Sequence, residues 1–157
     1  MSGTRTDSAA LPGAAGVLVG VDLVEVERIA QTVERFGPRF LERVFTQEEL
    51  HEGRSRITWL AGRFAAKEAC AKALGTGVGA AAAWRDMQVL RQPSGKPTLR
   101  LSGDAATRAT ALHIAQIDLS ISHTHQYAIA VVVALTTSVD VVSSGSDTGG
   151  AAGPTPA

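Results

Sequence analysis

The chain has 157 residues, with 15 basic and 15 acidic side chains, so its formal net charge is zero. This balance gives no overall attraction to nucleic acid or anionic lipid, and we expect neither as a partner. No apolar run approaches the roughly 20 residues that span a bilayer, and the N-terminus lacks an adequate signal-peptide core, so we expect a soluble cytoplasmic protein. The single cysteine, Cys70, excludes an internal disulfide and fits that location.

Both ends of the chain differ in composition from the middle. Residues 1–15 are small and polar, and residues 136–157 are rich in Gly, Ser, Ala and Pro. Such segments bury too little apolar surface to fold, so we predict disordered tails around one domain at 16–135. A domain of roughly 120 residues supports one hydrophobic core but is small for an enzyme with a deep cleft. Neighbouring subunits are therefore expected to help build any site.

The chain order of hydrophobic patterns predicts the class of fold. A Val- and Leu-rich run predicts a first strand over 17–24, and the helix that follows, over 25–36, ends at Gly37-Pro38. Thr46 and Glu49 match a capping box at the start of a second, short helix. The remaining predicted elements are a long helix over 55–74, a hairpin of strands over 87–91 and 98–101, a helix over 103–114, and strands over 117–122 and 127–135. One strand, three helices, two strands, one helix and two strands in that order predict an α+β fold.

The segment 63–77 places charged residues inside the long helix, which is otherwise Ala-rich. At 100° per residue, Glu68 falls on the apolar stripe of this helix, and Lys67 lies beside it on the core-facing side. Because an unpaired buried charge costs several kcal/mol, Glu68 is expected to pair with Lys72, to meet another chain or to bind a cation. The helix is expected to end at Gly75-Thr76-Gly77, where glycine can adopt the left-handed cap.

Asp22 interrupts the apolar first strand and raises the same question as Glu68. Two such acids suggest a shared Mg²⁺, which takes one or two protein carboxylates and fills its other positions with water and phosphate oxygens. Paired acids are also common without a metal, and the spacing of Glu68 and Lys72 equally suits an ordinary helical salt bridge. His123 and His125, at the bend of the last hairpin, are interpreted as ligand contacts rather than zinc ligands.

Four motifs resemble those of one known family. Residues 20–29 and 63–77 resemble the two signature blocks of the bacterial holo-acyl-carrier-protein synthases. Residues 94–97 (Ser-Gly-Lys-Pro) are similar to the family's Gly-Lys-Pro hairpin, and residues 118–128 to its closing strand motif. The resemblance covers about residues 16–135. It implies a 4'-phosphopantetheinyl transferase fold of the short, single-lobe type, which assembles as a homotrimer with sites between subunits.

The resemblance also implies an activity. It is a Mg²⁺-dependent transfer of 4'-phosphopantetheine from coenzyme A to a serine of an apo acyl carrier protein, which releases adenosine 3',5'-bisphosphate. Asp22 and Glu68 match the family's metal-binding pair, and Lys72 matches a lysine that stabilises charge on the diphosphate. The serine proton would leave to Glu68 or to a metal-bound water.

Further residues gain expected roles from the same resemblance. The predicted contacts of coenzyme A are Lys67, Gly95, Pro97, Ser122, His123 and Thr124. Arg28 matches an arginine that contacts the carrier protein, and Arg35 extends that basic patch along the first helix. Many relatives have a histidine where this chain has Asp118, so this carboxylate is interpreted as a base, a supporting partner or a structural residue. A non-catalytic module that binds coenzyme A or a carrier protein is the alternative function, and the carrier could serve fatty-acid or polyketide synthesis.

Overall fold

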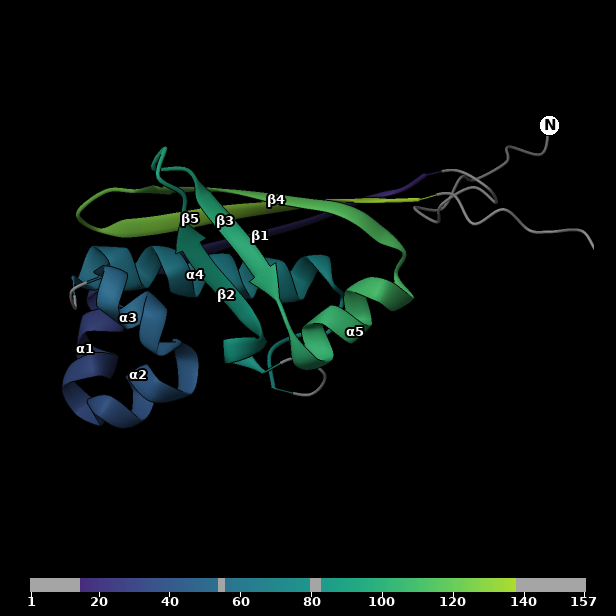
Figure 1. The fold of residues 1–157 in the computed structure, drawn as a ribbon. Coiled ribbons are helices and arrows are strands. Elements are labelled where there is room, and N and C mark those ends of the chain that lie inside the picture. The colour runs from purple at the N-terminus through teal and green to yellow at the C-terminus, as the bar shows by residue number, and fades with distance from the viewer. Residues whose placement is uncertain (1–14, 54–55, 80–82, 138–157) are drawn as a thin grey trace, which may run out of the picture.

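The computed structural model describes residues 15–53, 56–79 and 83–137, so the predicted tails lie almost wholly outside it. The helices are α1 (Val26–Phe36), α2 (Pro38–Val44), α3 (Gln47–Gly53), α4 (Ile57–Ala73) and α5 (Gly103–Ala111), with a 3-10 turn, η1 (Trp84–Asp86). The strands are β1 (Val17–Glu25), β2 (Met87–Arg91), β3 (Pro97–Leu101), β4 (Ile114–His123) and β5 (Tyr127–Thr136). The long α4 lies along one face of a sheet, and α1, α2 and α3 gather at one end (Figure 1).

The main sheet has three antiparallel strands in the order β1-β5-β4, and β2 and β3 form a separate hairpin. β1 and β4 are therefore the two edges of the main sheet. Their register is fixed through β5, because Asp22 lies opposite Ala130 and Ala130 lies opposite Ile121. The expected mixture of helices with antiparallel strands is confirmed.

Small residues allow α4 to lie very close to this sheet. Ala65, Ala66 and Ala69 are fully buried in α4, and a Cβ atom on Gly20 of β1 would collide with the carbonyl oxygen of Ala69. At the other edge, a Cβ on Gly62 would lie 3.0 Å from a methyl group of Ile121. The helix thus crosses from β4 to β1, and the side chains on its two flanks emerge at opposite edges of the sheet.

The ends of two helices match the prediction. Gly75 has a φ of +67°, and the amides of Gly75 and Thr76 donate to the carbonyls of Lys72 and Ala71, which is the Schellman arrangement. At the start of α3, the Thr46 amide donates to Glu49 at 2.8 Å, and the Glu49 amide donates to the Thr46 hydroxyl at 3.3 Å. The predicted glycine cap and the predicted capping box are both confirmed.

Helix α2 was not expected. The stop at Gly37-Pro38 is correct, but Pro38 also begins α2, which runs directly on from Gly37. Proline suits the first position of a helix because the amide it lacks would have no helical partner there. The Gly37-Pro38 pair therefore lies between two consecutive helices. In the sequence, such a pair predicts the end of the first helix but not the start of the second.

The face of the sheet opposite α4 is apolar, and none of the other described helices and strands covers it. Its large side chains are 37–62% exposed: Val17, Val19, Val21, Leu23, Ile129, Val133 and Leu135. Strand alternation explains the pattern, because these residues point away from α4 while Gly20, Val24, Ala130 and Val132 point toward it. None of the described helices has the length and hydropathy needed to cross a membrane. An apolar face of this extent in a folded domain marks an interaction surface.

Candidate active site

Three of the predicted site residues converge where β1 meets α4. Asp22 alternates onto the α4 side of β1, and Lys72 from the last turn of α4 lies 2.8 Å from its Oδ1 atom. The Lys72 ammonium also donates to the Val21 carbonyl at 2.9 Å. Glu68 lies one turn earlier on the same strip of α4 and interacts electrostatically with both. The close approach of β1 and α4 thus brings together residues about 50 positions apart in the chain.

The environment of Glu68 is unfavourable for a negative charge. Partial burial raises the pKa of Glu68, the neighbouring Asp22 carboxylate raises it further, and Lys72 lowers it in part. Lys72 pairs with Asp22, and the alternative Glu68–Lys72 salt bridge is not among the ion pairs of the described residues. A divalent cation between the two carboxylates would relieve their repulsion.

The prediction that Glu68 lies on a core-facing stripe is wrong in detail. α4 is buried almost all round, and Phe64, Glu68 and Lys72 form its less buried strip. Glu68 is therefore half-buried and accessible at the edge of the sheet. An apolar periodicity cannot separate a buried strip from an open one when the helix is covered on nearly every side.

The donor set of this cluster fits Mg²⁺. Asp22 and Glu68 supply two carboxylates, and within residues 15–53, 56–79 and 83–137 no group of three or more His, Cys, Asp or Glu side chains could hold a metal. A structural zinc site would need more protein ligands than this. Mg²⁺ is commonly bound by one or two protein carboxylates, with water and phosphate oxygens as its remaining ligands, and this pair matches that pattern.

A second polar site, a cavity of about 190 Å³, lies at the β4 edge. We call it the arginine pocket. Its lining is Arg56, Thr58, Trp59, Gly62, Arg63, Arg91, Gly95, Pro97, Ile121 and His123. The positive charge comes from α4, from the residue preceding it and from the end of β2. This concentration of guanidinium groups suits a phosphate-bearing ligand.

Arg63 gives the arginine pocket its chemical character. Its side chain is 5% exposed, and its guanidinium carbon lies 4.0 Å from the centroid of the Trp59 ring. Its Nε and Nη2 atoms are buried without a hydrogen-bond partner among the described residues. Burial, followed by the charge of Arg91, lowers the pKa of Arg63 to about 10. A buried cation with unused donors is prepared for an anionic ligand.

This role of Arg63 was not predicted, although the residue belongs to the motif over 63–77. Arg56 and Arg91 were not singled out at all. The available signal was a guanidinium group inside an Ala-rich buried helix, which needs a partner as much as a buried carboxylate does.

The predicted contacts of coenzyme A divide between locations. Gly95, Pro97 and His123 line the arginine pocket. Ser122 lies on the opposite face of β4 from His123, because neighbouring strand residues alternate and Ser122 is in register with the exposed Ile129. The hydroxyl of Thr124 accepts hydrogen bonds from the amides of Gln126 and Tyr127 in the final turn.

The prediction that Lys67 binds the coenzyme does not fit its surroundings. Its side chain is fully buried, and its ammonium group lies 2.9 Å from Glu49 Oε2 and 3.0 Å from the Trp84 carbonyl. The core-facing placement was correct, but the partner is an interior carboxylate. We therefore do not retain Lys67 as a coenzyme ligand.

Asp118 lies outside the carboxylate cluster. Its Oδ2 atom is 2.6 Å from Lys96 Nζ, and this hydrogen bond is the main cause of its lowered pKa. The pair links the tip of the β2–β3 hairpin, between Gly95 and Pro97, to strand β4. Of the three interpretations of Asp118, the structural one matches this contact.

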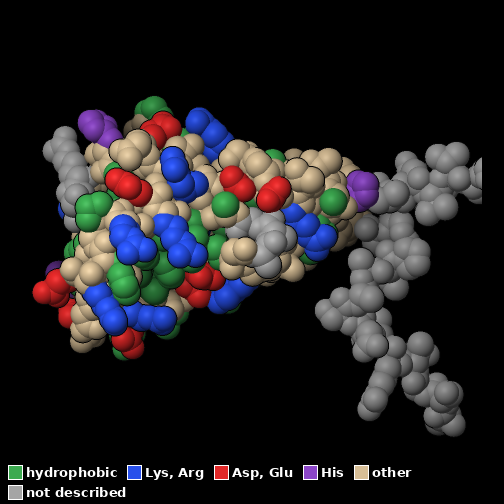
Figure 2. Space-filling view, turned by 90° about the horizontal axis from the view of Figure 1, so that it is seen from below, with side chains coloured by type: hydrophobic (Ala, Val, Ile, Leu, Met, Phe, Trp, Pro, Cys, Tyr) green, Lys and Arg blue, Asp and Glu red, His purple; other side chains and the backbone are tan. Residues whose placement is uncertain are grey.

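The two predicted carrier-protein contacts lie on the outer side of α1. Arg28 and Arg35 are both exposed and are two turns apart, so they share one face of the helix. Beside them, a groove of about 320 Å³ is lined by Thr32, Phe36, Arg39, Phe40 and Arg43. Figure 2 shows hydrophobic side chains bordered by Lys and Arg side chains at this helical end of the molecule.

Comparison with known proteins agrees with these features. The family described as the 4'-phosphopantetheinyl transferase superfamily matches residues 18–132. This chain belongs to that superfamily. The match begins in β1 and ends in β5, so the transferase domain contains both the carboxylate cluster and the arginine pocket.

Relatives of this transferase domain share one name. The holo-[acyl-carrier-protein] synthase of Koribacter versatilis is 47% identical over 117 residues, covering 73% of this chain and 94% of the relative. That of Methylobacterium radiotolerans is 50% identical over 111 residues, covering 66% and 82%. Among solved structures, the Helicobacter pylori synthase in complex with coenzyme A has a TM-score of 0.69 at 36% identity, covering 74% of this chain and 99% of that one.

Proposed function

We propose that the protein is a holo-acyl-carrier-protein synthase, which transfers 4'-phosphopantetheine from coenzyme A to a serine of an apo acyl carrier protein. A bond forms between the serine oxygen and the β-phosphorus of the coenzyme, and the bond from that phosphorus to the bridging oxygen breaks, releasing adenosine 3',5'-bisphosphate. The observation that carries this proposal is the convergence of Asp22, Glu68 and Lys72 in a chain 47% identical to a synthase of that name.

Asp22 and Glu68 would hold Mg²⁺, which when bound supplies positive charge to the diphosphate oxygens. Lys72 is 51% exposed at its side chain, so its ammonium group can contact the diphosphate beside Asp22. The serine proton would leave to Glu68 or to a metal-bound water. In this assignment Lys72 would balance charge on the leaving group.

The lining of the arginine pocket suits the binding of a coenzyme that carries phosphates at its nucleotide end. Arg63 offers unused buried donors, and Arg56 and Arg91 add charge at the open side. Gly95 and Pro97 form one wall of the pocket. We assign this pocket to the nucleotide end and the carboxylate cluster to the diphosphate and the reacting phosphorus.

The separation of these two parts supports a site shared between subunits. Asp22 lies on edge strand β1 and His123 on edge strand β4, with β5 between them and α4 filling the space above. The open apolar face of the sheet, including Val21, Leu23 and Ile129, offers the surface for assembly. We propose a homotrimer in which the β1 edge of one subunit meets the β4 edge of the next.

We assign the binding surface for the carrier protein to α1 and α2. Arg28 and Arg35 would contact acidic side chains of the carrier, and the neighbouring groove holds Phe36, which is 49% exposed, for an apolar contact. These contacts are reached from outside the molecule, as a macromolecular substrate requires. A cytoplasmic location for the protein also stays a prediction.

Mass spectrometry of the carrier tests the activity directly. The full chain is incubated with coenzyme A, Mg²⁺ and an apo acyl carrier protein, and we expect a mass gain of one phosphopantetheine group. Carriers from fatty-acid and polyketide synthesis are compared, and Glu68→Gln serves as the inactive control. Binding of coenzyme A with no mass gain on any carrier would favour the non-catalytic module instead.

A further inference from the structure

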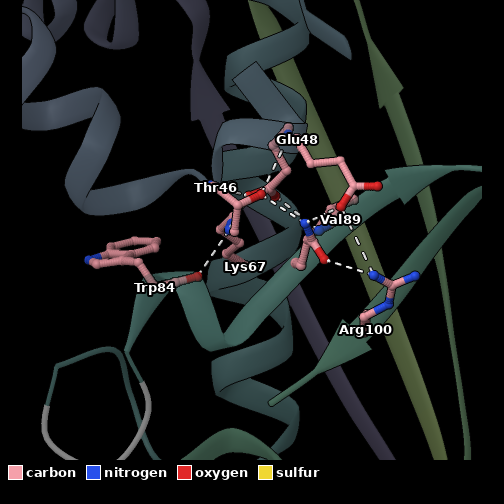
Figure 3. A network of polar contacts seen from close by, with 8 residues as sticks. Thr46, Glu48, Lys67, Trp84, Val89 and Arg100 are labelled. Atoms are coloured by element: carbon pink, nitrogen blue, oxygen red, sulfur yellow. Dashed lines mark hydrogen bonds and ion pairs between the residues drawn. The ribbon is translucent and has the colours of Figure 1, made fainter. Parts of the chain in front are cut away.

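An ion pair between Glu49 and Lys67 lies in the interior, apart from the carboxylate cluster. Both side chains are 0% exposed and their charged atoms are 2.9 Å apart, within the network of Figure 3. Burial lowers the pKa of Lys67, and the Glu49 charge opposes this shift. Replacing such a pair by apolar residues is often neutral or stabilising in proteins. Fold stability alone therefore does not account for it.

Glu49 is surrounded entirely by donors. Its Oε1 atom accepts from the Val89 amide at 2.9 Å, and its Oε2 atom accepts from the Thr46 amide at 2.8 Å and from Lys67. A glutamine here would turn its amide nitrogen toward one of these donors, whereas both oxygens of the Glu49 carboxylate accept. Lys67 donates in turn to the Trp84 carbonyl at 3.0 Å. These directional bonds join α3, β2 and η1 to one point on α4.

The packing of α4 on the sheet does little to fix the rotation of the helix about its axis. Along the turns that carry Glu68 and Lys72, the buried residues of α4 are small: Ala65, Ala66, Ala69, Cys70, Ala71 and Ala73. Side chains of this size form shallow ridges, so they restrict rotation of a helix about its axis less than interlocking large residues do. Lys67 is the long side chain of these turns that is fully buried and bonded in the interior, whereas Lys72 makes its bonds at the exposed edge. Glu68 is the residue that follows Lys67.

We propose that the Glu49–Lys67 pair positions the carboxylate of Glu68. By holding Lys67 toward α3 and β2, the pair sets the rotation of α4 so that Glu68 faces Asp22. Glu49 and Lys67 are positioning residues, because their charged groups contact each other and the backbone in the interior. The kinetic part of this inference rests on the proposed transfer, and its cation-binding part rests on the proposed Mg²⁺ site at Asp22 and Glu68.

The test replaces Lys67 by methionine in the full chain. Calorimetric titration of Mg²⁺ into the protein with coenzyme A present should show the dissociation constant for Mg²⁺ rising by about tenfold, as when a supporting partner of a metal ligand is removed. The value of kcat should fall by about tenfold or more, because small displacements of reacting groups are costly. At saturating Mg²⁺, KM for coenzyme A should change less than kcat, since the arginine pocket assigned to the nucleotide end lies at the other edge of the sheet.

Val44→Ala is the matched control. Val44 is 2% exposed in α2, so its truncation leaves a cavity without removing a bond to α4. It should lower the melting temperature but keep the wild-type Mg²⁺ affinity. If Lys67→Met fails to fold, Glu49→Gln removes the same ion pair and takes its place.

Three results separate the possibilities. Wild-type Mg²⁺ affinity and kcat in Lys67→Met or Glu49→Gln would overturn the positioning role. An equal loss of Mg²⁺ affinity in Val44→Ala would show that a general loss of core stability explains the effect. That result would also overturn the positioning role. A wild-type protein that transfers nothing would contradict the proposed function, while the Mg²⁺ titration would still decide the positioning role.

Discussion

Gly20 of β1 lies directly against the backbone of Ala69 in α4. A Cβ atom at Gly20 would collide with the Ala69 carbonyl oxygen and would come within 2.7 Å of the Ala73 amide nitrogen. Neither obstacle is the movable end of a side chain. This contact sets the distance between the strand that carries Asp22 and the helix that carries Glu68 and Lys72.

Gly20→Ala should therefore damage both stability and activity. The added methyl group must push α4 away from β1, and overpacking of this kind costs about 1–3 kcal/mol. Chemical denaturation should show the lower free energy of unfolding, and carrier modification should slow. Gly16→Ala is the control, since a Cβ there meets only the Thr136 hydroxyl at 3.0 Å. Equal behaviour of the two variants would contradict the role of Gly20.

Glu68→Gln should abolish transfer without destabilising the fold. The carboxylate stabilises charge at the reacting phosphorus, so its loss should cost on the order of a hundredfold or more in kcat. The raised pKa of Glu68 means that the native state holds its proton more tightly than the unfolded state does. Stability is therefore lost as pH rises from the unfolded pKa, about 4.3, through the raised native value.

The side-chain amide of the Glu68→Gln variant does not titrate, so this variant does not lose stability as the pH rises. At pH 7 without Mg²⁺, Glu68→Gln should unfold at equal or higher denaturant concentration than the wild type, and the difference should vanish at acidic pH. Equilibrium unfolding at several pH values checks this. A variant clearly less stable than the wild type at pH 7 would count against the unfavourable environment inferred for Glu68.

Arg91→Ala should weaken coenzyme binding rather than chemistry. Hydrogen bonds to charged groups contribute about 1.5–3 kcal/mol, so KM for coenzyme A should rise by roughly tenfold or more while kcat changes little. Arg100→Ala, whose side chain is 67% exposed on β3, is the control of equal charge. Steady-state kinetics with varied coenzyme A separates the two, and a similar KM for both variants would remove Arg91 from the site.

Leu23→Lys should break the proposed assembly. Leu23 is 61% exposed on the apolar face of the sheet, so the isolated subunit tolerates a lysine there but a buried interface does not. Light scattering after size exclusion should report a smaller particle, with loss of transfer. Thr107→Lys on the exposed side of α5 should leave the particle mass unchanged. A wild-type mass for Leu23→Lys would place the interface elsewhere.

Asp118→Asn should have a small effect. The bond to Lys96 lowers the pKa of Asp118, so its contribution to stability is present above the unfolded pKa and is lost as pH falls through the native value. Both side chains are about half exposed, so the loss at pH 7 should stay below about 1 kcal/mol. Thermal unfolding at neutral and acidic pH measures it. A large fall in kcat would instead favour Asp118 as a base.

Local signals in the sequence predicted most of the helices and strands. The capping box at Thr46 and the glycine cap at Gly75 depend on neighbouring residues, so their patterns were sufficient. The partner of Lys67 lies 18 residues away, and no periodicity within one helix could identify it as Glu49.

The arginine pocket was missed for the same reason. Arg56 and Arg63 belong to the start of α4, but Arg91 comes from the end of β2, and the three meet only when the β2–β3 hairpin lies beside α4. Neither the number of charged residues nor a sequence motif indicates that these three side chains lie together. The resemblance to a family identified Asp22 and Glu68 together, which spacing alone supported only weakly.

The placement of Asp22 and the arginine pocket on opposite edge strands has a consequence for how many sites an assembly can complete. If each site joins the β1 edge of one subunit to the β4 edge of the next, an open pair of subunits completes one site and leaves one unmatched half at each end. Closing a ring completes as many sites as there are subunits. At coenzyme A concentrations below the raised KM of Arg91→Ala, mixed rings of Glu68→Gln and Arg91→Ala subunits should then be more active than rings of either variant alone, because each mixed ring contains a junction where both intact halves meet.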